Sequence, residues 1–247
     1  MSGHSKWATI KRAKGAKDAA RGKLFSRFIK EITIAARSGG GDPTGNPRLR
    51  LAIDKAKGAN MPADNIKRAI QRGTGEIEGM SYEEYTYEGY GAGGVALLVE
   101  VITDNKNRTV AEIRHLFSKN NGNMGESGSV AWKFERKGVI SVPKKYGEDD
   151  LMMIALDAGA QDMTSEEESY EIYTTSSDFD AVRTALETQS IEITEAEILM
   201  VPTNTMKVEG KDAESVLRLV EALEEHDDVQ NVYADFDIDE NVMESLG

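Results

Sequence analysis

The stretch YEEYTYEGYGAGGVALLVEVI, residues 82–102, decides which class of fold this chain adopts. Its last part, VALLVEVI at residues 95–102, is a run of aliphatic and β-branched residues that is typical of a buried strand. The glycines before this run are turn signals, and residues 82–90 can form the partner strand. The stretch therefore predicts a β-hairpin, and it places the start of a region of mixed strands and helices near residue 82.

The glycine-rich segment GYGAGG, residues 89–94, also matches the G-x-G-x-x-G pattern of dinucleotide-binding loops. That pattern works only between a strand and a helix, because the helix N-terminus binds the pyrophosphate. Here a strand-like run follows the glycines, and the P-loop pattern G-x-x-x-x-G-K does not occur in the sequence. The context therefore favours a hairpin turn over a nucleotide site.

The residues before the hairpin predict a small helical domain. An apolar stripe at helical spacing predicts a helix over residues 23–37. Its opposite face carries the cations Lys23, Arg27, Lys30 and Arg37. After the loop signal SGGGDPTGNP, helices are expected at residues 47–59 and 62–72, each with Pro in its first turn. Residues 1–22, rich in Lys, Ala and Gly, are interpreted as a mobile or loosely helical arm.

The residues after the hairpin predict a second, self-contained set of strands and helices. A helix is expected at residues 108–119 and a strand at residues 129–134. The next segment has the order strand, helix, strand, strand, helix, strand, which is the ferredoxin-like arrangement. Its expected strands are residues 139–142, the region around Met163, 170–175 and 191–200, and its expected helices are residues 148–158 and 178–188. Segments at residues 206–208, 211–224 and 229–236 would then complete the sheet that the hairpin begins.

The expected fold class is α+β and multidomain: an N-terminal three-helix domain plus two ferredoxin-like α+β domains, one inserted in the other. The expected boundaries are residues 1–78 for the basic arm and helical domain, 79–137 and 202–247 for the discontinuous α+β domain, and 138–201 for the inserted α+β domain.

The composition excludes several kinds of chemistry. The 247 residues include no cysteine, which excludes disulfides, thiolate metal sites and a cysteine nucleophile. The N-terminus lacks an apolar segment of the signal-peptide type, and no run approaches the ~20 apolar residues of a membrane span. A cytoplasmic location is therefore expected.

The charges of the chain are divided unevenly along it. The chain holds 30 Lys and Arg against 43 Asp and Glu, yet residues 1–75 hold 17 bases against five acids, a net of +12, which leaves −25 on the remainder. Such a division predicts a polyanion partner for the first third, through phosphate contacts that release counterions. The candidate contacts there are Lys6, Trp7, Lys11, Arg12, Lys14, Lys17, Arg21, Lys23, Arg27 and Lys30. Trp7 fits either stacking on a base or pinning the arm to the helical domain.

A second candidate anion contact lies on the helix expected at residues 108–119. Val110, Ile113 and Phe117 are expected to face inward. The outer face would then carry Arg108, His115 and Lys119. Ordinary solvated surface charges would produce the same pattern.

Metal, catalytic and membrane functions have weaker signals. His226, in EEHDD, fits a loop at a helix end better than a metal site, and DFDID at residues 235–239 lacks the Gly and Glu that an EF-hand requires. No Ser-His-Asp or paired-acid arrangement stands out, so no metal, cofactor or enzymatic activity is expected. A membrane-surface role for residues 23–37 is disfavoured, because the apolar face of this helix is needed as the core of its small domain.

Four segments carry a resemblance to the YebC family: GHSKWATIKRAKGAKDAARGKLFSR, GGGDPTGNPRLRLAIDKAK, YEGYGAGGVALLVEVITDNKNRTVAEIRHLFSK and GSVAWKFERKGVI. The resemblance extends nearly end to end, although Ala92 stands where many members have Pro in the hairpin. It implies a cytoplasmic bacterial protein of three domains without enzymatic activity, and it supplies no catalytic residues. Bacterial members are described as probable DNA-binding transcriptional regulators, and members have also been linked to translation and to ribosomes stalled on proline-rich nascent chains.

The sequence thus predicts a non-enzymatic, nucleic-acid-binding regulator of gene expression. The family label favours duplex DNA as the partner. The basic arm is similar to the tails of ribosomal proteins, so ribosomal RNA, in a translation factor that relieves stalling at proline-rich chains, is the alternative. Both partners would use the same cations, and the residues do not separate them.

Overall fold

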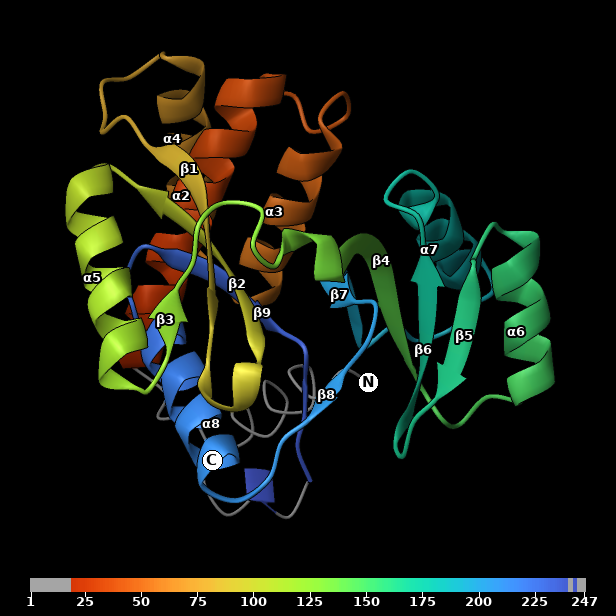
Figure 1. The fold of residues 1–247 in the computed structure, drawn as a ribbon. Coiled ribbons are helices and arrows are strands. Elements are labelled where there is room, and N and C mark those ends of the chain that lie inside the picture. Colours follow the sequence, from red (N-terminus) through yellow and green to blue (C-terminus); the bar gives the residue numbers. More distant parts are fainter. Residues whose placement is uncertain (1–18, 240–241, 244–247) are drawn as a thin grey trace.

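The computed structural model describes residues 19–239, 242 and 243, and its first unit is helical (Figure 1). The unit consists of α2 (Ala19–Gly39), α3 (Pro47–Gly58) and α4 (Ala63–Thr74). Its core is formed by Ile32, Ala35, Ala36, Leu49, Ala52, Ile53, Ala56, Met61, Ile66 and Ala69. The helices expected after the SGGGDPTGNP loop are confirmed, and α2 begins at Ala19, where the sequence predicts residue 23.

A polar residue, Asn46, and a small residue, Gly73, fix how these helices pack together. The Asn46 side chain caps α3 by accepting the N–H of Leu49 (3.1 Å), and it donates to the Ala35 carbonyl of α2 (2.8 Å). Gly73 of α4 lies so close to the Thr33 carbonyl that a Cβ there would collide with it. The helices therefore pack at backbone distance, which only glycine permits.

The predicted hairpin is confirmed and forms the centre of the first sheet. β1 (Glu83–Tyr90) and β2 (Ala96–Thr103) pair antiparallel, with Glu83 opposite Thr103 and Tyr90 opposite Ala96. The turn between them is a 3₁₀ turn, η1 (Ala92–Gly94), in which Gly93 and Gly94 have φ of 69° and 84°. The full strand order is β3-β1-β2-β9, with β3 (Asn123–Met124) and β9 (Val229–Ala234) at the edges.

The first sheet is covered differently on its two faces. Helices α5 (Lys106–Lys119) and α8 (Gly210–Glu224) pack against Leu97, Val99 and Val101 on one face. The opposite face presents Ala96, Leu98 and Tyr233, which pack against Val130 and Phe134. The contact with Val130 and Phe134 joins the first sheet to β4 (Phe134–Pro143), the first strand of the second sheet.

The second sheet has the ferredoxin-like element order that the sequence predicts. It contains β4 (Phe134–Pro143), α6 (Glu148–Asp157), β5 (Asp162–Ser165), β6 (Ser169–Thr174), α7 (Phe179–Thr188) and β7 (Glu195–Pro202). The strands lie in the order β5-β6-β4-β7, and each neighbouring pair is antiparallel. Helices α6 and α7 share one core with Ile140 and Ile172. The α+β class, with a helical domain and two sheet domains, is confirmed.

Several local predictions are wrong. The sequence predicts a strand at residues 129–134, but this segment contains the 3₁₀ turn η2 (Ala131–Lys133), and β4 begins only at Phe134. The expected strand at 206–208 does not join the first sheet, because β8 (Met206–Lys207) pairs in parallel with β10 (Phe236–Asp237). On α5, Thr109 takes the buried position expected for Val110, and Val110 is only half-buried.

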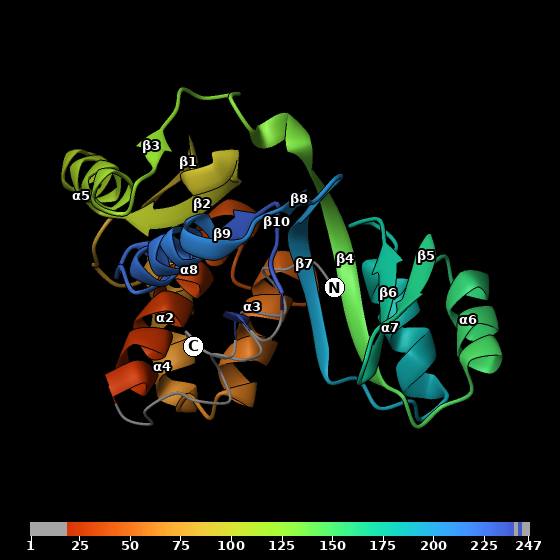
Figure 2. The same cartoon turned by 60° about the horizontal axis from the view of Figure 1, so that its bottom comes forward.

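Helix α3 lies between α2 and the second sheet in both overall views (Figures 1 and 2). Ion pairs connect it to that sheet unit: Arg50 with Asp180, Lys55 with Glu197 (2.8 Å), and Asp54 with Arg183 (3.5 Å). The helical unit thus contacts both sheet units. Among the described residues, no helix is both long and apolar enough to cross a lipid bilayer.

Candidate nucleic-acid interface

The structure describes only some of the residues that the sequence proposes for this interface. The arm residues Lys6, Trp7, Lys11, Arg12, Lys14 and Lys17 lie outside the described residues. The remaining candidates are Arg21, Lys23, Arg27 and Lys30 on α2, and Arg108, His115 and Lys119 on α5. Four of these, Lys23, Arg27, Lys30 and Arg108, converge on the end of α8 and the loop that connects it to β9.

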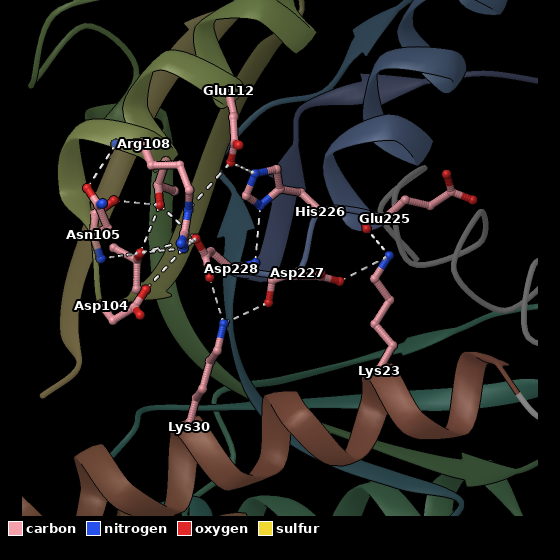
Figure 3. A network of polar contacts seen from close by, with 12 residues as sticks. Lys23, Lys30, Asp104, Asn105, Arg108, Glu112, Glu225, His226, Asp227 and Asp228 are labelled. Atoms are coloured by element: carbon pink, nitrogen blue, oxygen red, sulfur yellow. Dashed lines mark hydrogen bonds and ion pairs between the residues drawn. The ribbon is translucent and has the colours of Figure 1, made fainter. Parts of the chain in front are cut away.

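The cations of α2 bind the C-terminal end of α8. Lys23 donates to the Glu225 carbonyl, and Lys30 donates to the Asp227 carbonyl at 2.9 Å (Figure 3). Arg27 donates to the Glu224 carbonyl. The last carbonyls of a helix have no intrahelical partner and form the negative end of its dipole. Helix α2 therefore supplies the positive charge that α8, which has no base in its last turn, does not provide itself.

Asp228 is the centre of the contact between α2 and α5 (Figure 3). Its side chain is only 5% exposed, and its Oδ1 accepts from Lys30 Nζ at 2.7 Å. Its Oδ2 accepts from Thr109 Oγ1 (2.7 Å), Arg108 Nη2 (2.7 Å) and Thr103 Oγ1 (3.1 Å). Burial alone would raise the pKa of Asp228, but the hydrogen bonds from Lys30, Thr109 and Arg108 hold this pKa well below its ordinary value.

The local sequence explains why Arg108 reaches this carboxylate. Asn105 caps α5 by accepting the N–H of Arg108 at 3.1 Å, which starts the helix directly after β2. Arg108 then pairs with Asp228 and also with Asp104 (3.1 Å), and Asp228 raises the pKa of the guanidinium. Arg108 therefore belongs to an internal ion network as well as to the protein surface.

Arg27 is half-buried on α2 and is held against the end of α8. Its burial lowers the pKa of the guanidinium, and the charges of Glu224 and Asp227 oppose that shift. Its Nε is buried and has no hydrogen-bond partner among the described residues. This side chain is held against α8 and could reach a phosphate only after leaving it.

The other described candidates lie apart from this network. Arg21 is exposed at the start of α2 beside Phe25. His115 and Lys119 are exposed further along α5 and form no ion pair with another described residue. The structure thus does not bring His115 and Lys119 to the place where Arg108 and the α2 cations meet.

A cleft of about 630 Å³ opens beside the Asp228 network, lined by Lys23, Lys30, Met80, Tyr82, Asp104, Arg108, Glu112, Glu225, His226, Asp227 and Asp228. Its walls carry both signs of charge.

Within this cleft, potential metal-ligand atoms of Glu112, His226 and Asp228 lie within 4.8 Å of one another. The Nδ1 of His226 accepts the Asp228 N–H at 3.1 Å, so the neutral ring carries its proton on Nε2, which lies 2.9 Å from Glu112 Oε2. A ring bonded in this way is a hydrogen-bond donor to Glu112, which favours a polar anchor over a metal site.

Three functional positions were not identified from the sequence. Arg48 of α3 bridges Glu31 (2.8 Å) to Glu84 of β1, and so joins the helical unit to the first sheet. Asp228 and the buried Glu88 each anchor a loop through several donors. Acidic residues are so frequent in this sequence that nothing marks these as buried, except that Asp228 directly precedes a strand.

The helical unit also presents outward-facing cations on α3 and α4. Lys57, Lys67, Arg68 and Arg72 are exposed, and none of them forms an ion pair with another residue that the structure describes. Asn65, Arg68 and Arg72 are spaced by three and four residues, which places them on one side of α4. This side of α4 is a basic surface without an internal partner.

These features define a class of protein: a basic helical unit held by ion pairs to an acidic body of two antiparallel sheets, with outward cations left over. Comparison with known proteins gives the family. Residues 5–76 match the TACO1/YebC protein N-terminal domain, and residues 82–236 match the TACO1/YebC second and third domain. The chain belongs to the TACO1/YebC family.

Relatives of similar length support this membership. A protein of Geobacter sp. strain M21 named "Probable transcriptional regulatory protein" is 58% identical over 246 residues, covering 100% of both chains. A protein of Desulfotalea psychrophila with the same description is 60% identical over 248 residues, covering 100% of this chain and 99% of that one. The crystal structure of a conserved hypothetical protein from Aquifex aeolicus superposes with a TM-score of 0.81 at 49% identity, covering 90% of this chain and 92% of that chain.

Proposed function

We propose that this protein binds nucleic acid through its basic N-terminal third and acts as a non-enzymatic regulator of gene expression. The observation that carries the proposal is the surplus of 17 bases over five acids in residues 1–75. Lys30, Arg48, Arg50 and Lys55 pair with acids inside the protein. Lys57, Lys67, Arg68 and Arg72 form no ion pair with another described residue, and we assign them, with the arm cations, to an external anion. The relatives named probable transcriptional regulatory proteins support the same reading.

The cations divide into two groups by what they contact. Lys23, Arg27 and Lys30 hold the helical unit against α8, so a direct contact with phosphate would require their release. We therefore assign the first phosphate contacts to the arm residues Lys6, Lys11, Arg12, Lys14 and Lys17, followed by the outward cations of α4. Trp7 lies among the arm cations and can add stacking to them.

Duplex DNA is the partner that α4 favours. A helix that reads base edges needs Arg, Asn or Gln along one side, and Asn65, Arg68 and Arg72 have that spacing. Gln71 of α4 lies off this side of the helix and donates to Glu76 Oε2 at 3.4 Å, so few side chains of the kinds that read base edges are placed together for a groove. We expect a preference for any specific duplex below the ~10³-fold that dedicated regulators show.

Ribosomal RNA is the second candidate, and the arm favours it. An aromatic residue among closely spaced bases, as in SKWATIKRAKGAK, suits irregular and single-stranded RNA. In this case the protein would act on translation, and the expected role is relief of ribosomes stalled at proline-rich nascent chains. Crosslinking in cells followed by sequencing of the bound nucleic acid separates the two partners: reads on ribosomal RNA support translation, and reads clustered at promoters support transcription.

The proposal is tested by binding measured over a range of salt concentrations. Deleting residues 1–22 should weaken binding to a random duplex and to a ribosomal RNA fragment. For each phosphate that the shortened protein no longer neutralises, the slope of log K against log salt should decrease by ~0.7–0.9. Lys207→Gln is the matched control, because Lys207 is 76% exposed and pairs only with its neighbour Glu209 among the described residues. An unchanged slope in the shortened protein would show that the arm does not make the electrostatic contact.

A further inference from the structure

Trp132 is the most exposed large apolar side chain among the described residues, with 71% of its surface accessible. It lies in η2, at the junction between the loop that follows β3 and the first residue of β4. Large aromatic residues are usually well buried, and an indole that stays in water forgoes that stabilisation. The stability of the fold therefore does not explain why the Trp132 side chain is exposed.

The ring is exposed on a rigid support. Glu88 of β1 is 5% exposed, and its carboxylate accepts the N–H groups of Gly128 (2.7 Å), Val130 (2.7 Å) and Ala131 (2.8 Å). Burial would raise the pKa of Glu88, but these backbone hydrogen bonds lower it below its ordinary value, so the group stays ionised and bonded. The backbone on the N-terminal side of Trp132 is thus fixed up to Ala131.

The orientation of the indole is fixed as well. Its Nε1 donates to the Ser129 carbonyl at 3.1 Å, and the same carbonyl accepts from the Tyr90 hydroxyl at 2.9 Å. The polar edge of the ring is thereby bonded to the protein itself. The apolar π-face of the ring is therefore available to a partner, and its orientation is fixed in the unbound protein.

The surroundings of Trp132 are charged and not apolar. The segment AWKFERK, residues 131–137, contains three bases and one acid, in the part of the chain that carries −25 overall. Lys133 lies 6.0 Å from the indole centroid and also binds Asp235. Arg136 is exposed and forms no ion pair with another described residue. The other exposed large apolar side chains, Leu24, Ile77, Met80, Met153 and Leu156, come from α2, the segment before β1, and α6.

We propose that Trp132 is a stacking platform for an unpaired nucleobase, with the exposed Arg136, four residues further along the chain, as the candidate contact for a phosphate of the same strand, an inference that rests on the nucleic-acid function proposed above. A protein partner would be expected to need apolar neighbours around the aromatic anchor. A flat ring with its N–H already satisfied and a cation close by matches the way single strands are bound. Bases in a duplex are stacked on each other, so the platform discriminates in favour of single-stranded or looped RNA or DNA.

The first experiment leaves Trp132 unchanged. In the full chain carrying Trp7→Phe, Trp132 is the sole tryptophan. A twelve-nucleotide uridine RNA should quench its fluorescence and protect it from acrylamide, and a duplex of equal length should do neither at matched occupancy. An absence of quenching and protection when the RNA is bound would overturn the proposal.

The second experiment measures affinity. Trp132→Ala should weaken binding of the uridine RNA by about 5- to 150-fold, the range found for loss of one stacked base, and change duplex binding less than about twofold. Trp132→Phe should retain part of the effect, since a smaller ring still stacks. Met153→Ala, at a residue that is 60% exposed on α6, is the matched control and should change neither affinity.

The outcomes separate this proposal from the one on which it rests. If the unaltered protein binds neither RNA nor DNA, the nucleic-acid function itself fails. If it binds both and Trp132→Ala weakens neither, or weakens both equally, the stacking role is overturned and the nucleic-acid function stands. Should Trp132→Ala not fold, as judged by circular dichroism, the fluorescence titration decides alone.

Discussion

Asp227 and Asp228 show how far two identical neighbours can differ. The Asp227 side chain is 83% exposed, whereas that of Asp228 is 5% exposed and bonded by residues of α2, β2 and α5. Their sequence context, EEHDD, gives both the same charge and the same propensity. The difference arises because β9 begins at Val229. The residue directly before this strand, Asp228, is therefore buried at the edge of the sheet, and Asp227 is not. Such a distinction depends on tertiary contacts, and the sequence alone does not contain it.

Replacing Asp228 should therefore be far more costly than replacing its neighbour. Asp228→Asn leaves Lys30, which is 12% exposed, and Arg108 without their common carboxylate. The expected loss is about 2–4 kcal/mol of the free energy of unfolding of the first sheet and helical unit. Asp227→Asn is the matched control and should cost less than about 0.5 kcal/mol. Urea unfolding of the two variants measures both, and equal losses would contradict the central position of Asp228.

The same carboxylate should make stability depend on acid pH. Because the pKa of Asp228 is lower in the folded than in the unfolded protein, its contribution is fully present above its unfolded pKa of about 3.9 and is lost as the pH falls below that value. Unfolding free energies measured between pH 7 and pH 3 should thus fall less steeply below about pH 4 in Asp228→Asn than in the unaltered protein. Parallel curves would show that another carboxylate carries the acid sensitivity.

At the scale of the elements, long periodic segments were predictable and short ones were not. The apolar stripe of α2 and the strand pair β1 and β2 follow directly from residue spacing. The strands β3, β8 and β10 contain two residues each, too few to show a period. The apolar SVAWKF run suggests a strand, but Glu88 takes up the N–H groups of Val130 and Ala131, which therefore cannot join a ladder.

The second sheet provides a test of domain independence. The sequence places an inserted domain at residues 138–201, but the ladder between β4 and β7 extends from Phe134 opposite Pro202. We expect residues 134–202 to fold alone, because helices α6 and α7 close their own core against this sheet. A piece cut at 138 and 201 loses the outer ladder pairs, worth about 1 kcal/mol, and should melt about 4–8 °C lower. Thermal unfolding followed by circular dichroism compares the two, and a disordered proton spectrum for residues 134–202 would favour one continuous body.

At the scale of the molecule, the charge division has two roles. The sequence shows a basic first third and an acidic remainder, and it suggests an external anion for the whole surplus. In the structure, part of the surplus is matched inside the protein, by Glu84, Asp180, Glu197, Asp228 and the end of α8. The sequence does not predict which cations form ion pairs inside the protein, because these pairs join segments up to about 200 residues apart.

Two sets of substitutions should separate the internal role from the external one. Neutralising the arm with Lys11→Gln, Arg12→Gln, Lys14→Gln and Lys17→Gln should weaken nucleic-acid and ribosome binding and leave the radius of gyration unchanged. Reversing Lys23→Glu and Arg27→Glu places acids against the α8 carbonyls and Asp227, so the helical unit should detach and the radius measured by X-ray scattering should rise. This reversed variant should also fail to co-sediment with ribosomes, because the helical unit that carries the proposed contacts is no longer fixed to the body. If it loses binding while its radius stays constant, and the arm variant binds normally, then Lys23 and Arg27 contact the nucleic acid themselves and α8 is only their resting partner.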